Sequence, residues 1–387
     1  MLSLLLLVLA AQTPAAPATG PAIEPVFVAY TAELERGISS GDAAVLDSRI
    51  DVEQLIARST RGISAPKGFA DGFGQGVRRS GVPLGKQLVA AWDDESDFHL
   101  LRMRLDGTTP HALFRVISKA GINYLDLELA RDAKGAVVVS DIYPYISGEL
   151  LSDTLRRTYL QAANESGLDL VDKLMGKEQE FIKNLPKLQD MQRFAREEKF
   201  TEVVKTFNEL PASLRQNKSF LLIRLNASSH LEETEYQKAI ADFEKAFPDD
   251  PSLDLISIDG QMMRKDYAAV MKTIEQLDAR VKDPYLHYLR GSVMLEKGDG
   301  KEARRYFQSA IDAEPRLVMP YWVMISLSLT DKKYKDTARY LTGIERGAGV
   351  RLSDLKELEQ YQGFVKSKEY KAWNKERQAR LAADAAP

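Results

Sequence analysis

Hydrophobic residues in the first third of the chain recur first at helical and then at strand spacing. Apolar positions three to four residues apart predict helices over Val26 to Ser40 and Ala43 to Arg58, with a break at Gly41-Asp42. A further helical stretch is indicated by Phe69, Phe73 and Val77. We therefore expect the folded part of the chain to begin with helices.

Four segments of alternating hydrophobic and polar residues follow, separated by short connections that contain Gly or Asp. The predicted strands are Asp97 to Leu105, His111 to Ser118, Ile122 to Arg131 and Val137 to Ile146. Strict alternation would place His99, Leu101, Met103 and Leu105 on one face of the first strand. Short turns between consecutive strands are typical of an antiparallel meander, so the first part is predicted to be an α+β domain with helices on one sheet face.

The second half repeats a hydrophobic motif about every 34 residues. Its clearest copy runs from Pro284 to Pro315, with Gly291 in a first helix and Phe307 in a second. A helix–turn–helix unit of this kind buries its apolar face only by stacking on its neighbours. The repetition therefore predicts an all-α solenoid of helical hairpins.

Columns of apolar residues align from unit to unit. One column of mostly large side chains contains Phe207, Phe243, Ile274, Phe307 and Leu341. A second column, four residues earlier, contains Val203, Ala239, Val270, Ala303 and Thr337. Together with the order Gly, Ala, Phe, Ala, Pro in the clearest copy, these columns resemble the tetratricopeptide repeat. The resemblance implies a repeat domain over residues 184–387 that ends in a capping helix.

The first domain, residues 22–160, resembles the nuclear-transport-factor-like (SnoaL-like) cone fold. The resemblance rests on the order of elements, on the GDAA turn that ends Glu33 to Ala44, and on the last strand running into Asp141 to Tyr145. Other small α+β folds fit the same order. Residues 161–183 are expected to link the two domains, with helices predicted at Leu150 to Ala163 and Leu168 to Ile182.

Residues 1–21 have the pattern of a signal peptide followed by a disordered lead-in. Leu2 to Ala11 is apolar but short for a membrane span, and residues rich in Ala and Pro follow it. No Lys or Arg precedes the apolar stretch. We expect an exported protein, periplasmic or secreted, without a membrane span after signal cleavage. The alternative is a chain tethered to the membrane through an uncleaved N-terminus.

Composition narrows the class of function. Of 387 residues, 44% are hydrophobic and 28% charged, which is ordinary for a soluble globular protein. A net charge of −3 gives no basic surface for nucleic acid. The absence of Cys excludes disulfides, thiol catalysis and cysteine-ligated zinc.

Motifs for cofactors or metals are weak. The segment Gly72 to Gly76 lacks the preceding strand and the following acidic residue of a dinucleotide loop, so we interpret it as helix packing. The four histidines, at positions 99, 111, 230 and 287, lack metal-binding spacing. We expect no cofactor and no metal site.

Polar residues on the predicted strands offer one possible site for chemistry. They are His99, Tyr124, Asp126, Asp141 and Tyr143. Relatives with the cone fold use Asp or Tyr as an acid or base in a pocket between sheet and helices, and a buried carboxylate has a raised pKa. The alternatives are a solvated strand face for Tyr124 and Asp126, and a structural hydrogen bond for Asp141.

The tetratricopeptide resemblance also implies a concave groove lined by the first helix of each unit. Its candidate lining residues are Arg224, Leu255, Met262, Tyr285, Tyr288, Leu295 and Trp322. Aromatic and apolar anchors of this kind suit a peptide or protein partner. The alternative is that Tyr285 and Trp322 pack between units or against the first domain.

From these patterns we expect an exported, non-enzymatic scaffold that binds an extended peptide or protein partner in the groove of its repeats. The alternatives are a small-ligand binder or enzyme with a pocket in the first domain, and a structural part of a cell-envelope assembly. The sequence leaves the partner and the oligomeric state open.

Overall fold

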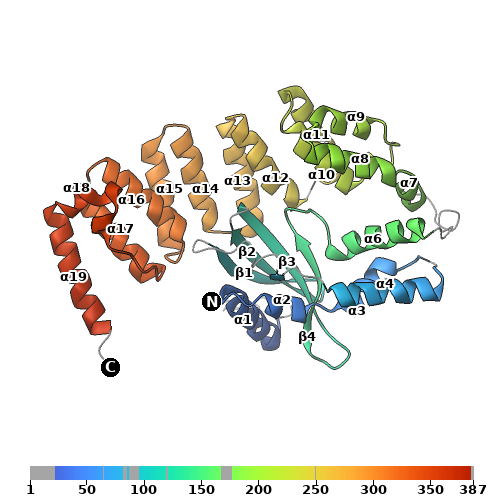
Figure 1. Cartoon of the computed structure of the whole chain (residues 1–387), viewed down its shortest axis with the longest axis horizontal. Coiled ribbons are helices and arrows are strands. Elements are labelled where there is room, and N and C mark those ends of the chain that lie inside the picture. Colours follow the sequence, from blue (N-terminus) through green and yellow to red (C-terminus); the bar gives the residue numbers. More distant parts are fainter. Residues whose placement is uncertain are drawn as a thin grey trace, which may run out of the picture.

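The computed structural model describes residues 22–63, 65–81, 85–86, 96–118, 121–166, 177–248 and 250–384. It shows an α+β domain with a four-stranded sheet, followed by a long series of helices (Figure 1). The predicted fold class is therefore confirmed. The predicted signal peptide at residues 1–21 and the first part of the helix expected at Leu168 to Ile182 lie outside the described residues.

Before the sheet, the described residues contain four helices of seven or more residues. They are α1 (Pro25–Ser39), α2 (Ala43–Arg49), α3 (Val52–Thr60) and α4 (Lys67–Ser80). The single helix expected over Ala43 to Arg58 is wrong, because it is divided in two. Ile50 forms an isolated parallel bridge with Val139, and the Asp51 side chain accepts a hydrogen bond from Gln54 N to begin α3. The glycines of residues 72–76 lie inside α4.

The sheet is an antiparallel meander with strand order β1-β2-β3-β4. Its strands are β1 (Asp97–Asp106), β2 (Thr109–Ser118), β3 (Gly121–Arg131) and β4 (Val137–Pro144). The prediction that His99 and Met103 share a face is wrong, because the register shifts between Leu100 and Arg102. His99 pairs with Arg115, whereas Met103 pairs with Ala112, and these two partners lie on opposite faces of β2.

One face of the sheet packs on the N-terminal helices. Side chains from both sides form this core, including Phe27, Leu34, Ile38, Leu46, Leu55, Phe98, Phe114, Leu125, Leu127 and Leu129. This core lies between the sheet and the N-terminal helices.

After the sheet, α6 (Leu151–Glu165) returns to pack on α3, and α7 (Lys177–Lys183) leads into the repeats. Five helical hairpins follow: α8 (Leu185–Arg196) with α9 (Phe200–Asn208), α10 (Lys218–Ser228) with α11 (Glu233–Ala246), α12 (Pro251–Met263) with α13 (Tyr267–Val281), α14 (Tyr285–Glu296) with α15 (Gly300–Ala313), and α16 (Val318–Thr330) with α17 (Tyr334–Gly347). Short helices, including α18 (Gln362–Val365), and the long α19 (Lys368–Asp384) end the chain.

The predicted columns are the packing core of these hairpins. Phe207, Phe243, Ile274, Phe307 and Leu341 are all at most 2% exposed. Gly291 allows α14 to approach α15, because a Cβ at this position would lie 2.6 Å from ring carbons of Phe307. Stacking of successive hairpins through these buried columns produces the arc of helices above the sheet in Figure 1.

The second face of the sheet packs on the inner helices of that arc. Leu113, Tyr124 and Tyr145 share one hydrophobic cluster with Leu255 on α12 and Leu286 on α14. The sheet therefore lies between the N-terminal helices and the repeats (Figure 1). None of the helices in the described ranges is both long enough and apolar enough to span a bilayer.

Candidate functional site

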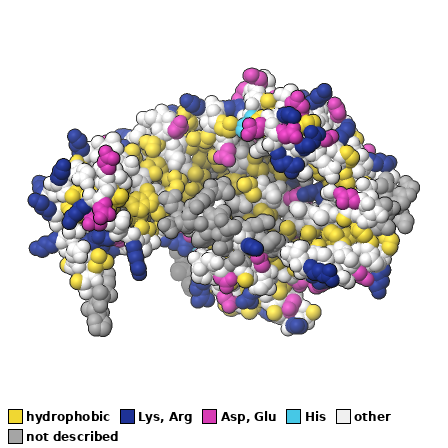
Figure 2. Space-filling model, in the orientation of Figure 1, with side chains coloured by type: hydrophobic (Ala, Val, Ile, Leu, Met, Phe, Trp, Pro, Cys, Tyr) yellow, Lys and Arg dark blue, Asp and Glu magenta, His cyan; other side chains and the backbone are white. Residues whose placement is uncertain are grey.

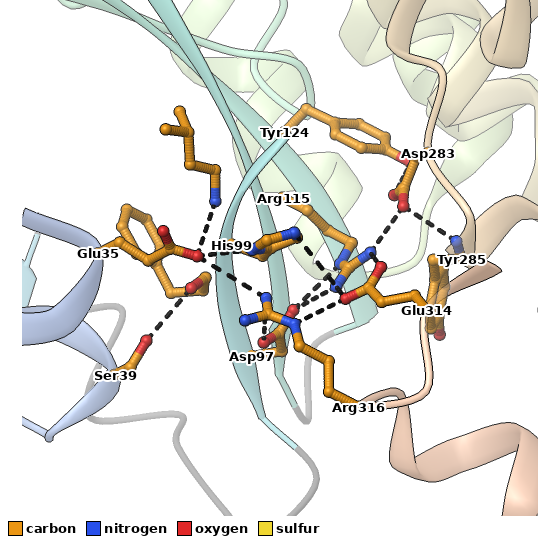
Figure 3. A network of polar contacts seen from close by, with 12 residues as sticks. Glu35, Ser39, Asp97, His99, Arg115, Tyr124, Asp283, Tyr285, Glu314 and Arg316 are labelled. Carbon is orange, nitrogen blue, oxygen red and sulfur yellow. Dashed lines mark hydrogen bonds and ion pairs between the residues drawn. The ribbon is translucent and has the colours of Figure 1, made fainter. Parts of the chain in front are cut away.

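A buried charged cluster joins the sheet to the repeats (Figure 3). Arg115, whose side chain is 0% exposed, lies at its centre on β2. It donates hydrogen bonds to Asp97 at 2.5 Å, to Asp283 at 2.6 Å and to Glu314 at 2.8 and 2.9 Å. Asp283 precedes α14 and Glu314 follows α15, so one guanidinium holds two turns of the repeat domain against the sheet.

The carboxylates of this cluster respond differently to their surroundings. Burial raises the pKa of Asp283, although its oxygens accept hydrogen bonds from Arg115, the Tyr124 hydroxyl and Tyr285 N. Burial would also raise the pKa of Glu314, but hydrogen bonds from Arg115 and Arg316 outweigh it and lower that pKa to about 2. Glu314 is therefore ionised in the folded protein at neutral pH.

His99 extends the same cluster toward α1. Its Nδ1 lies 2.5 Å from Glu35 Oε1, and its Nε2 lies 4.0 Å from Glu314. Arg316 contacts Glu314 at 2.8 Å and Asp97 at 3.3 Å. His99 and Tyr124, two of the predicted pocket residues, thus belong to an interdomain lock in which the charged groups contact one another.

Asp126 and Tyr143 instead line a cavity of about 720 Å³ between the sheet, α6 and the start of α10. We call it the junction cavity. Its lining includes Arg104, His111, Asp126, Glu128, Tyr143 and Tyr145 from the sheet, Glu149, Asp153, Arg156 and Arg157 from the segment around α6, and Gln216, Lys218 and Phe247 from the repeats.

Ion pairs organise the walls of the junction cavity. The Asp126 carboxylate forms an ion pair with Arg104, and its Oδ1 lies within hydrogen-bonding distance, 3.0 Å, of His111 Nδ1. Glu149 is bonded to Arg157. Lys218, whose pKa is lowered by burial, binds Asp250, which also accepts a hydrogen bond from the Tyr143 hydroxyl at 2.9 Å.

Asp141 lies behind this wall and has a structural environment. Its carboxylate accepts hydrogen bonds from Ile142 N at 2.9 Å and Ser152 N at 3.2 Å, and pairs with Arg58 at 3.2 Å. It therefore ties α3 and the start of α6 to β4. The predicted pocket residues are thus divided among the lock, the cavity and a structural contact.

The predicted groove residues are also divided. Leu255 and Tyr285 are buried where the sheet meets the repeats, and Met262 packs against the same cluster as Leu255. Arg224 is 1% exposed and pairs with Glu235 and Asp242. The sheet therefore covers the middle of the inner wall, which the repeat pattern alone did not reveal.

The remaining groove residues lie toward the C-terminus. Tyr288 packs on Phe307, Leu295 is 37% exposed, and half-buried Trp322 lines a hollow of about 420 Å³ with Leu329 and Tyr361. Figure 2 shows hydrophobic side chains gathered on this face over α14 to α16. Leu295 and Trp322 therefore keep part of their side-chain surface accessible to solvent.

An apolar groove also lies between the repeats and the ends of the strands. It has a volume of about 570 Å³, and we call it the flanked groove. Its lining includes Leu222, Leu225 and Asn226 of α10, Leu255, Ile256, Asp259 and Met263 of α12, Leu289 of α14, and Ile122 and Ile146 of the sheet region. Met263 and Ile146 are 59% and 56% exposed, which is high for large apolar side chains.

The described ranges include an imidazole–carboxylate pair in the junction cavity, His111 with Asp126. They contain no group of three or more His, Asp or Glu residues arranged to hold a metal ion. The pair of His111 and Asp126 could orient an imidazole, but no hydroxyl of a described residue is hydrogen-bonded to that ring.

Sequence reasoning missed the lining residues that neighbour Asp126 and Tyr143 in space. Arg104, Arg157 and Lys218 come from three separate parts of the fold, and no local spacing connects them. In comparisons with known proteins, no protein-family model, no curated protein and no solved structure matches the chain.

Proposed function

We propose that this protein is a non-enzymatic binding scaffold that holds an extended peptide segment of a partner protein in the flanked groove. The observation that carries this proposal is the apolar groove between two modules, with Ile146 and Met263 exposed at its walls. An extended peptide can bury alternate apolar side chains there while its backbone remains hydrogen-bonded to groove polar groups or water.

The two modules give the groove a fixed shape. The sheet and the repeats share the hydrophobic cluster around Tyr124 and Leu286, and Arg115 bonds to Asp283 and Glu314 beside it. A wall that is rigid before binding loses less conformational entropy when the partner binds. The sheet thus limits the length of the inner wall but helps to preorganise the part that stays open.

Two sequence-based expectations are part of this proposal. We propose that the hairpins belong to the tetratricopeptide type, which their period and buried columns support. We also propose that the protein is exported, which the apolar Leu2 to Ala11 segment supports. Sequencing the N-terminus of the mature protein tests export: a start near Ala11 is expected, and an intact N-terminus would favour membrane tethering.

Selection from a displayed peptide library against the full chain tests groove binding. We expect selected peptides to lose affinity more than about tenfold for an Ile146→Asp/Met263→Asp variant, because a charge then replaces each apolar anchor. The matched control is Val26→Asp/Val28→Asp on α1, since these valines are also exposed, at 42% and 48%, but lie outside the groove.

Equal affinity of the selected peptides for both double variants would show that the flanked groove is not the peptide-binding site. A Trp322→Ala variant then decides whether the open C-terminal hollow is the site, because Trp322 lines that hollow and not the flanked groove. Failure to select any peptide that binds the folded chain would contradict peptide binding itself.

A further inference from the structure

The junction cavity has the size of a small-molecule site. Its volume of about 720 Å³ falls within the range of roughly 300–1,000 Å³ that ligand pockets occupy. Both modules contribute to it, which is a common location for ligand sites. We infer that the junction cavity binds an uncharged, polyhydroxylated ligand with an apolar face, such as a short oligosaccharide.

The charge balance of the cavity favours an uncharged ligand. Four acidic and four basic side chains line it, and the acidic groups Asp126, Glu128 and Glu149 are paired with arginines. A charged ligand would lose hydration without gaining a net opposite charge, and it would compete with pairs that already exist. A neutral ligand leaves these pairs in place.

Paired charges still offer hydrogen bonds to a neutral ligand. A carboxylate has more acceptor sites than its ion pair uses, and a guanidinium has five donors. When His111 donates Nδ1–H to Asp126, its Nε2 is left as an acceptor. Sugar hydroxyls act as donor and acceptor at once, so they match a wall that presents both kinds of group.

The Gln216 side chain at the cavity makes no polar contact among the described residues that would stabilise the fold. Gln216 lines the cavity, is exposed, and makes no hydrogen bond with another side chain in the described ranges. Its amide offers a donor and an acceptor to a bound molecule. Gln216 is therefore a ligand contact that can be altered without disturbing the hydrophobic core.

Aromatic rings supply the apolar side of the cavity. Tyr143 and Phe247 are half-buried lining residues, and Lys218 Nζ lies 4.9 Å from the first ring centroid and 5.5 Å from the second. These contacts hold the rings in place. The C–H face of a sugar ring can pack on such a surface while its hydroxyls face the ion pairs.

Isothermal titration calorimetry of the full chain with neutral trisaccharides, for example maltotriose, cellotriose and xylotriose, tests the inference. We expect at least one to bind, and Gln216→Glu and His111→Leu each to weaken it about fivefold by removing one hydrogen bond. His111→Leu leaves Asp126 paired with Arg104, and circular dichroism checks that it folds. The matched control, Gln237→Glu on exposed α11, should leave binding unchanged.

Three results would overturn the inference: no neutral trisaccharide binds, a trigalacturonate or inorganic phosphate binds more tightly, or both cavity variants bind as well as the wild type. The test is independent of peptide binding. A selected peptide and a trisaccharide should bind together, because the flanked groove and the junction cavity have no lining residue in common.

Discussion

Arg115 and Glu314 form a bidentate ion pair with N–O distances of 2.8 and 2.9 Å, although their positions in the chain differ by 199. Arg115 comes from the middle of the sheet and Glu314 from the turn after α15. Both partners are largely removed from water. Water has little access to either charge in the folded protein. Each charge therefore depends on the other for its stabilisation, and the sheet and the repeats must pack together for the pair to form.

Removing the cation should strongly destabilise the protein. We expect Arg115→Leu to lower the free energy of unfolding by about 3–5 kcal/mol, because Asp283 and Glu314 then stay buried without their partner. Urea unfolding followed by circular dichroism measures the change. Arg131→Leu is the control: its pair with Glu24 is exposed, so the loss should stay below about 1 kcal/mol. Similar losses for the two variants would show that Arg115 does not hold the modules together.

Acid should remove the contribution of Glu314. Its folded-state pKa is about 2 and the ordinary value is 4.5, so this stabilisation is present above pH 4.5 and is lost as the pH falls toward 2. The difference corresponds to about 3 kcal/mol. We expect Glu314→Gln to be less stable than the wild type at pH 6, and the gap to narrow progressively between pH 4.5 and 2. A gap that is independent of pH over this window would contradict the lowered pKa.

Asp254 on α12 should show the opposite dependence on pH. Burial raises its pKa to about 6, despite the Arg280 guanidinium 3.0 Å away. Its contribution to stability is therefore fully present below pH 3.8 and is lost as the pH rises through 6. As the pH rises from 4 to 8, the free energy of unfolding of Asp254→Asn should increase by up to about 3 kcal/mol relative to that of the wild type. Urea unfolding at both pH values measures this gain, and an equal difference between the variant and the wild type at the two pH values would contradict the raised pKa.

The sequence predicts those parts of the fold whose hydrophobic pattern is set by residues close together in the chain. The strands followed from alternation and from their short turns, and the repeat core followed from residues such as Phe243 and Phe307, because each unit buries the same positions. The bulge in β1 was missed, because one extra residue reverses the two faces without changing the alternation that the sequence shows.

The candidate sites were less accessible to sequence reasoning. Tyr285 occupies a groove position in the repeat pattern, yet it lies in one cluster with Ile117 of the sheet. Whether a second domain fills a groove depends on how the two parts dock, and the repeat period carries no information about docking. Asp126 was identified from strand alternation, whereas Lys218, which lines the same cavity, lies 92 positions away in the sequence (218 minus 126).

Gly291 should be required for the close contact between α14 and α15. In Gly291→Ala the new methyl group would overlap the ring of fully buried Phe307. We expect this overpacking to destabilise the protein by about 1–3 kcal/mol, which exceeds the stabilisation from the higher helix propensity of Ala. Gly76→Ala in α4 meets no atom within 4 Å and should instead stabilise the protein by about 0.5–1 kcal/mol. Thermal unfolding compares them. Partial rescue by Gly291→Ala/Phe307→Leu would identify the clash as the cause, and a stable Gly291→Ala would contradict it.

The turns of the hairpins offer a second test of the repeat backbone. Two residues before the second helix, four units have a positive φ: 56° at Glu198, 57° at Lys265, 88° at Gly298 and 55° at Lys332. Only one of these positions holds Gly, and a left-handed conformation is unfavourable for a residue with a Cβ. We therefore expect exposed Lys332→Gly to raise the free energy of unfolding by about 0.5–1 kcal/mol, and Gly298→Ala to lower it by a similar amount. Because the turns are in different units, the effects of Lys265→Gly and Lys332→Gly should add in urea unfolding. A loss of stability in Lys332→Gly would show that the lysine side chain, rather than the backbone, determines the turn.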